Sequence, residues 1–296
     1  MNAVNKTVFH KAYGKGIVKE HNGGKITVDF SGLEKLFFIP DSFEKGFLST
    51  EDEELNAFVA STVSDKINTE AMKNKARKTC PVLFCNISWM ENYLGENEND
   101  IPVNGGSHVK KHKTCNESVN FSPIIVTTGN YDEEKLMLLG SFETKSTNGE
   151  VSNQTHIERI NGCKALTRSN QADGVTVVWC ATAPSGSTRV VGWYKNATVY
   201  RYYKQMPMEE EDGFEWERWY NVSCDACNAV LLPTKDRLNE KWSVPRHNPL
   251  NPVPFGFGQA NIWYADQEEA KDYVCQMIES IESYFGENII PSVEGF

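Results

Sequence analysis

The sequence predicts an α+β fold in three parts: a small N-terminal β-barrel over residues 1–48, a helical connector over 49–79 and a larger α+β domain with a curved sheet over 80–290. Short runs of alternating apolar and polar residues, typical of half-buried strands, fill the first and third parts. Apolar residues at helical spacing fill the second part. At 296 residues the chain is long enough to bury a substantial core.

The N-terminal part contains the clearest strands. "KITVDF" over 25–30 alternates apolar and polar residues, and Gly23 and Gly24 before it favour a hairpin turn. "KLFFIP" over 35–40 predicts a further strand that ends at Pro40. These strands predict a small barrel.

The rest of the chain continues with one helix, a series of strands and a final helix. A Ser/Thr–Glu start near residue 50 precedes five residues at helical spacing, which predicts a capped amphipathic helix: Leu55, Phe58, Val59, Thr62 and Val63. Seven apolar runs predict the strands of the larger domain: 81–87, 123–129, 135–142, 175–182, 189–194, 197–203 and 228–233. The last helix is predicted over 268–285, where apolar residues form one core-facing stripe.

The composition is that of an ordinary soluble globular protein, with 24% charged and 40% hydrophobic residues. No apolar run approaches the roughly 20 residues that span a bilayer. The N-terminus also lacks the apolar core of a signal peptide, so we expect a cytoplasmic protein without membrane contact. Eight cysteines are scattered along the chain, and without a secretion signal we expect them to be reduced.

The formal net charge of −10 argues against nucleic-acid binding by bulk electrostatics, because phosphate contacts supply most non-specific affinity. Acidic runs at 49–55 and 209–212 are expected on solvated surface. The charge reverses in two basic runs, 73–78 and 110–113, so nucleic-acid binding would need a local patch of this kind.

Motifs for metal binding are sparse. Cys224 and Cys227 form one CxxC with no second pair at zinc-finger spacing. His108 and His112 lie four residues apart, but two glycines precede them and no glutamate lies between them. We therefore predict no metal and no other cofactor.

A magnesium-dependent nuclease is the catalytic alternative. "FETK" at 142–145 places Glu143 and Lys145 in an ExK spacing after a predicted strand, and Asp132 upstream would be the partner carboxylate. That short spacing also occurs by chance in proteins without such a site.

The densest aromatic stretch is "VVGWYKNATVYRYYK" at 190–204. Alternation along a strand places Val190, Gly192 and Tyr194 on one face and Trp193 on the other. We expect Trp193 to face a cleft and Tyr194 to lie in the core, and Gly192 to permit a close approach to the backbone.

Rings and amides elsewhere in the larger domain extend this stretch into a predicted ligand site: Asn86, Trp89, Tyr93, Asn120, Trp193, Tyr194 and Asn196. Aromatic rings stack on unpaired bases, at roughly 1–3 kcal/mol per base, while amides hydrogen-bond base edges. Each ring alone also fits core packing, and each asparagine also fits a turn.

A second candidate is the loop "VPFGFGQANIWYAD" at 253–266. Phe255 and Phe257 precede the amides of Gln259 and Asn261. The loop is either a lid over a cleft or a segment packed on the sheet.

The N-terminal part resembles the SH3-like or Tudor-like modules at the ends of bacterial DNA-repair helicases and in transcription–repair coupling factors. The shared pattern is a histidine, an aromatic-Gly-x-Gly-x-Val strand, a turn and a strand ending in Phe, here at these positions: His10, Tyr13, Gly14, Gly16, Val18 and Phe30. The resemblance covers about one-sixth of the chain. It implies binding of nucleic acid or of another protein rather than catalysis.

Residues 80–205 resemble the PUA-like superfamily, which includes the EVE, YTH, ASCH and SRA domains, through "VTVVWCAT" followed by "RVVGWY". The runs 85–95 and 104–121 also look like an uncharacterised domain of bacterial restriction and phage-defence proteins. The resemblances imply a non-catalytic reader of modified or single-stranded DNA or RNA in a defence or repair assembly, with a nuclease or ATPase as partner protein. The third hypothesis is a scaffold whose acidic surface binds a protein.

Overall fold

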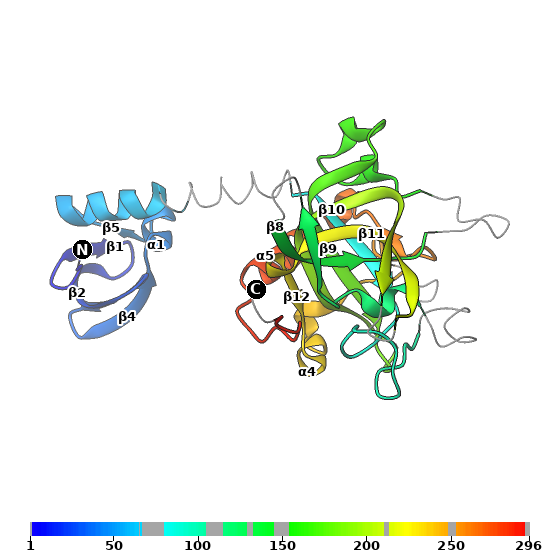
Figure 1. The fold of residues 1–296 in the computed structure, drawn as a ribbon. Helices are drawn as coiled ribbons and strands as arrows, with labels where there is room; N and C mark the ends of the chain where they lie inside the picture. Colours follow the sequence, from blue (N-terminus) through cyan, green and yellow to red (C-terminus); the bar gives the residue numbers. More distant parts are fainter. Residues whose placement is uncertain are drawn as a thin grey trace. The chain divides into compact units, whose positions relative to one another are not determined.

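The protein is an α+β molecule of two compact units, Met1–Lys78 and Thr79–Phe296 (Figure 1). The computed structural model describes residues 2–64, 66, 80–104, 115–128, 133–144, 154–209, 213–247 and 253–293. We describe each unit by itself.

The first unit contains a five-stranded antiparallel sheet in the order β4-β3-β2-β1-β5. Its elements are β1 (Thr7–His10), β2 (Gly14–Asn22), β3 (Lys25–Phe30), β4 (Leu33–Phe38), the short helix α1 (Asp41–Glu44) and β5 (Leu48–Ser49). The predicted strand over 25–30 coincides with β3. The first strand pairs with both the second and the fifth, so the chain returns to its start and encloses a small core.

The predicted connector helix packs on this five-stranded sheet. It begins at residue 53 and continues to residue 64. Leu55 is fully buried in the same core as Val18 and Ile26, and Phe58 and Val59 pack against that core. The helix is therefore part of the first unit rather than a free linker. The basic run 73–78 lies outside the described residues.

The second unit is built on a curled, mostly antiparallel sheet in the order β13-β6-β9-β10-β11-β8-β7, with β12 beside β10 (Figure 1). Its strands are β6 (Val82–Ile87), β7 (Ile124–Thr128), β8 (Glu133–Gly140), β9 (Gln171–Thr182), β10 (Thr188–Glu209), β11 (Glu215–Asp225), β12 (Ala229–Leu231) and β13 (Ile262–Trp263). Only the β6–β9 pair is parallel among the pairs of this sheet that the structure describes.

Short helices join these strands, and one longer helix follows them. They are η1 (Asn116–Val119), η3 (Ile157–Arg159), η4 (Lys164–Leu166), η5 (Ala226–Asn228), α4 (Thr234–Arg237), η6 (Glu240–Trp242), η7 (Glu268–Ala270) and α5 (Lys271–Glu282). The predicted C-terminal helix corresponds to η7 and α5.

Strand β10 produces much of the curl. It spans 22 residues, pairing first with β9 and β12 and then with β11. The predicted strands over 189–194 and 197–203 are therefore one strand. Asn196 between them has φ +52° and lies where the register shifts, so it forms a β-bulge rather than a turn.

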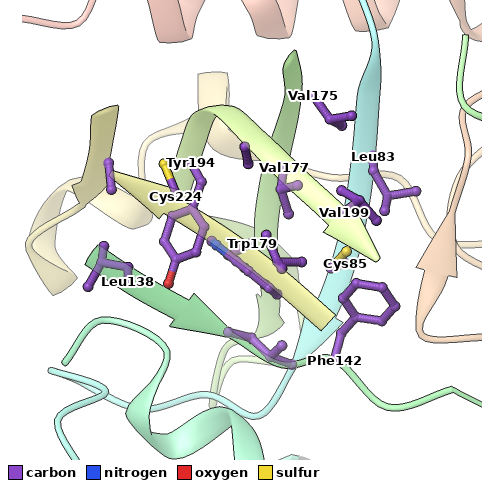
Figure 2. Packing of buried hydrophobic residues seen from close by; sticks show 14 of the residues in the cluster. Leu83, Cys85, Leu138, Phe142, Val175, Val177, Trp179, Tyr194, Val199 and Cys224 are labelled. Carbon is purple, nitrogen blue, oxygen red and sulfur yellow. The ribbon is translucent and has the colours of Figure 1, made fainter. Parts of the chain in front are cut away.

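Two apolar cores lie on opposite faces of this sheet. The core inside the curl includes Trp179, Tyr194 and Phe142 (Figure 2). The core on the other face includes Phe84 and Trp193, together with apolar residues of α5. Because both faces of the central strands are covered, their rings are packed in protein rather than presented to a ligand.

Candidate functional site

The prediction that Trp193 faces a cleft is wrong. Its side chain is only 1% exposed and packs against Trp242 and Tyr284, with ring centroids 5.3 Å apart in both cases. Tyr194 is fully buried on the opposite face, where its hydroxyl donates to the backbone carbonyl of Asn120. Both rings are core residues.

Trp193 is buried because η6 and α5 cover its face of the sheet, and the strand also contains a register shift that alternation could not reveal. The pairing of β10 with β9 slips between Val190 and Gly192. A bulge of this kind exchanges the two faces of a strand, so Val190 joins the core of Trp193 rather than that of Tyr194. A Cβ on Gly192 would collide with the Val230 carbonyl, so the chain's own strand β12 makes the close approach.

Three further predicted residues are buried structural groups. Trp89 and Tyr93 lie beside the buried guanidinium of Arg237, which is 5.4 and 5.8 Å from their ring centroids. Asn120 is fully buried and makes two hydrogen bonds to the backbone of Ser141. Its side-chain NH2 donates to the Ser141 carbonyl, and its side-chain oxygen accepts from the Ser141 N–H. These side chains are closed to a ligand in this structure.

Asn86 is the predicted residue that does join a half-exposed polar group. Its oxygen accepts from Arg246 Nη2 at 2.8 Å, and its amide donates to Asn261 Oδ1 at 3.4 Å. Asn261 in turn donates to Glu143 Oε2 at 3.2 Å. We name this chain of four residues, Arg246, Asn86, Asn261 and Glu143, the seam cluster, because it joins the β6–β13 edge to the segment after β8 and so holds the curl together.

A second carboxyl lies close to the seam cluster. Burial raises the pKa of Glu117, and the carboxylate of Glu143 raises it further. The cluster therefore contains a guanidinium, two amides and an acceptor carboxylate that bond to one another, with a carboxyl nearby that keeps its proton to higher pH than usual. Hydrogen-bonding groups of both kinds converge there.

The described residues do not form the site that the nuclease alternative requires. Glu143 accepts from Asn261, while Asp132 and Lys145 lie outside the described residues, as do His108 and His112. Within the described parts of the chain, no group of three or more His, Cys, Asp or Glu side chains is placed to hold a metal ion. Cys224 of the CxxC is buried and donates to the Lys195 carbonyl, whereas Cys227 is exposed.

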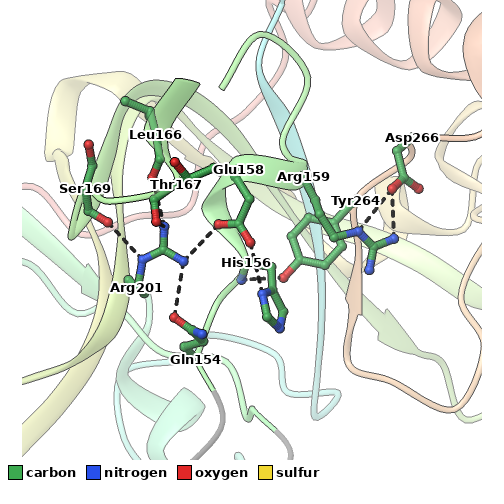
Figure 3. A network of polar contacts seen from close by, with 10 residues as sticks. All are labelled: Gln154, His156, Glu158, Arg159, Leu166, Thr167, Ser169, Arg201, Tyr264 and Asp266. Atoms are coloured by element: carbon green, nitrogen blue, oxygen red, sulfur yellow. Dashed lines mark hydrogen bonds and ion pairs between the residues drawn. The ribbon is translucent and has the colours of Figure 1, made fainter. Parts of the chain in front are cut away.

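The network around Arg201 illustrates how polar residues of the aromatic stretch serve the fold. Its guanidinium donates to the carbonyls of Ser169, Leu166 and Thr167 and to the side chains of Gln154 and Glu158 (Figure 3). Burial raises the pKa of the Glu158 carboxyl, but hydrogen bonds, including those from Arg201 and His156, outweigh burial and hold it below its usual value. Arg201 thus fastens residues 154–169 to β10.

The first unit contains a group of aromatic rings that is partly exposed. His10 Nδ1 accepts from the backbone N–H groups of Ala12 and Tyr13 at 3.1 and 3.3 Å, which folds the β1–β2 turn under the histidine. The Tyr13 ring stacks on His10 with centroids 4.6 Å apart and an interplanar angle of 23°. Tyr13 is nevertheless 43% exposed, so part of its ring remains open to solvent.

Phe30 and Phe37 support these two rings from beneath. Phe30 lies 5.4 Å from Tyr13 and 6.0 Å from Phe37, while Phe37 lies 5.4 Å from His10. A Cβ on Gly16 would lie 2.6 Å from the Phe30 ring, so glycine is required for this packing. We name the four rings, with Lys35, the aromatic face.

Charge distinguishes the two units. Lys35 Nζ lies 5.9 Å from the Tyr13 ring centroid, and Lys25 Nζ lies 5.4 Å from that of Phe38. Residues 1–78 carry 12 basic and 11 acidic side chains, whereas residues 79–296 carry 18 and 29. The acidity of the protein therefore belongs to the second unit, and the aromatic face lies on a nearly neutral one.

Comparisons with family models, curated proteins and solved structures give no match to this chain. No helix in the described ranges is long and apolar enough to cross a membrane. Sequence reasoning quoted His10 and Tyr13 only for a family pattern and missed Arg246 and Glu117. The sequence signal for the aromatic face is the "HKAYGKG" spacing at 10–16, in which the exposed Tyr13 ring stacks on His10.

Proposed function

We propose that the protein binds single-stranded nucleic acid without catalysis and that the aromatic face of the first unit is the contact surface. The observation that carries the proposal is the half-exposed Tyr13 ring, held by His10 and flanked by Lys35. A held ring loses little freedom when a base stacks on it, and a neighbouring ammonium is placed to move from the ring to a phosphate. The nearly neutral first unit repels a polyanion less strongly than the acidic second unit does.

The topology of the first unit supports the SH3-like or Tudor-like assignment within this proposal. Its five short strands follow the order β4-β3-β2-β1-β5, with β5 paired to β1, and α1 lies between β4 and β5 in the chain. The curled sheet with α5 on one face supports a PUA-like second unit. The same resemblances favour a defence or repair assembly in which a nuclease or ATPase supplies the chemistry.

The test compares two tyrosines. A fluorescein-labelled oligo(dT) is titrated with the protein, with Tyr13→Ala and with the matched control Tyr202→Ala, whose ring is 57% exposed on the second unit. Loss of one stacking contact of 1–3 kcal/mol should weaken binding by Tyr13→Ala about tenfold, whereas the control should bind as the parent does. Equal affinities for the two variants would remove the aromatic face from the proposal.

The seam cluster supports a second candidate, recognition of the edge of an unpaired or modified base. Arginine and asparagine make the commonest specific contacts to base edges, and Arg246, Asn86 and Asn261 converge there. Asn261→Ala should reduce discrimination between oligonucleotides that differ at one modified base, whereas Asn99→Ala, at an exposed amide, should not. Unchanged discrimination in Asn261→Ala would exclude this candidate.

A further inference from the structure

The β10–β11 ribbon presents a face that the nucleic-acid proposal does not use. Beyond the sheet, Lys204–Glu209 pairs only with Glu215–Tyr220 among the strands that the structure describes. Directly opposite residues share a face, so alternation assigns six residues to one side: Gln205, Pro207, Glu209, Glu215, Glu217 and Trp219. All six are exposed, and we name them the ribbon face.

The opposite side of the ribbon is anchored, which makes the ribbon face a fixed surface. Arg218 is 2% exposed, and its guanidinium donates to the carbonyls of Val119, Ser122 and Leu139. A buried cation with three carbonyl acceptors holds β11 against η1 and β8. The outward side chains therefore keep a defined spacing.

The ribbon face has one sign of charge and one large ring. It carries three glutamates and no lysine or arginine. Glu209 and Glu215 lie directly opposite each other, a like-charge arrangement that costs stability across antiparallel strands. Neither has a cationic partner among the residues that the structure describes, and Glu217 accepts only an amide hydrogen bond from Gln205, at 2.9 Å.

Trp219 supplies the apolar element of this face. Its ring is 39% exposed and is braced edge-on by Tyr203, with centroids 6.3 Å apart. Tryptophan is the side chain that a guanidinium stacks on best, and the neighbouring glutamates are acceptors for its N–H groups. A cation on this face would also relieve the repulsion between Glu209 and Glu215.

We propose that the ribbon face docks an arginine-rich segment of a partner protein. One guanidinium stacks on Trp219 while others pair with Glu215 and Glu217. Charge complementarity selects this occupant, since three carboxylates repel a phosphate backbone and the ring gives arginine an advantage over lysine. The interaction is independent of the aromatic face and adds a protein-binding role to the proposed nucleic-acid binding.

The test uses the full chain and a fluorescein-labelled peptide of four Arg-Gly repeats, measured by anisotropy at 50 mM NaCl. The double variant Glu215→Gln/Glu217→Gln should weaken binding about tenfold, because it removes two exposed ion pairs. Trp219→Ala should also weaken it, and the matching Lys-Gly peptide should bind less tightly than the Arg-Gly peptide. The control Glu98→Gln/Glu269→Gln removes the same charge from exposed positions elsewhere on the second unit and should stay within twofold of the parent.

Three results would overturn the proposal. The first is a failure of the Arg-Gly peptide to bind the parent protein at this salt concentration. The second is an equal loss of affinity in the control pair and in Glu215→Gln/Glu217→Gln, which would show attraction to net charge alone. Equal affinities for the arginine and lysine peptides together with an inert Trp219→Ala would also reject it. Oligo(dT) affinity, measured in parallel, should not fall in any ribbon variant, so a failure here is distinct from a failure of the proposed function.

Discussion

Replacing either Trp193 or Tyr194 with alanine should destabilise the second unit by about 3–5 kcal/mol. Trp193 packs between Trp242 and Tyr284 on one face of the sheet. Tyr194 packs against Trp179 on the other, with centroids 5.2 Å apart. Since each ring fills a buried site, truncation leaves a cavity in each case. Tyr194→Phe keeps the ring and removes only the hydroxyl bond to the Asn120 carbonyl, so it should cost about 1–3 kcal/mol.

Urea denaturation followed by tryptophan fluorescence measures these effects. All seven tryptophans lie in the second unit, so the signal reports on that unit alone. With an m-value of about 3 kcal/mol/M, the alanine variants should shift the midpoint down by about 1–2 M. A wild-type midpoint in either alanine variant would refute the burial of that ring, and would restore it as a ligand-facing group.

Four further outcomes are expected. Gly16→Ala should destabilise the first unit by about 1–3 kcal/mol through contact with the Phe30 ring, seen as faster amide hydrogen exchange in β2 and β3. Lys35→Ala should reduce the salt dependence of oligo(dT) binding by about 0.7 in the log–log slope, the value of one released counterion on a single strand. The folded pKa of Glu158 lies below its usual value, so the stabilising effect of this carboxylate is present above about pH 4.5 and is lost as pH falls through the folded pKa. Glu158→Gln should therefore lose less stability than the parent protein between pH 6 and pH 3, as measured by urea titrations. Burial raises the pKa of the Cys85 and Cys180 thiols, so iodoacetamide should label the exposed Cys227 while those two react only on unfolding, as mass spectrometry would show.

Local pattern was sufficient for most strands. The alternation in 25–30 and the apolar runs at 81–87 and 175–182 predict β3, β6 and most of β9. The prediction is correct for these segments because the pattern of apolar and polar side chains shows which faces of each strand are buried. Strand β11 was not predicted, since "EWERWYNVSC" mixes exposed charges with the buried Arg218 and its alternation is therefore masked.

The predicted site failed because both faces of the sheet are covered, which single-strand alternation cannot detect. A bulge changes which face a side chain occupies, and the shift between Val190 and Gly192 appears only when the pairing with β9 is known. Burial on both faces of the sheet likewise depends on α5 and η6, which are distant in sequence. Asn86 was placed among ligand-binding residues from its chemistry alone, and its partners Arg246 and Asn261 come from 160 and 175 residues further along the chain.

The aromatic face shows the opposite case. In the sequence, the spacing of His10, Tyr13 and Gly16 is only part of a family pattern. The fold shows the physical basis of this spacing. The histidine accepts two backbone N–H groups, the tyrosine stacks on it, and the glycine leaves room for Phe30. A short motif of this kind encodes a supported and exposed ring.

Photo-crosslinking of a single-stranded oligonucleotide shows whether bound nucleic acid contacts the aromatic face. An oligo(dT) containing 4-thiothymine is bound to the full chain, irradiated and digested, and the crosslinked peptides are identified by mass spectrometry. We expect crosslinks in peptides of the first unit that contain Tyr13, and their loss in Tyr13→Ala but not in Tyr202→Ala. Crosslinks confined to peptides of the second unit would contradict it.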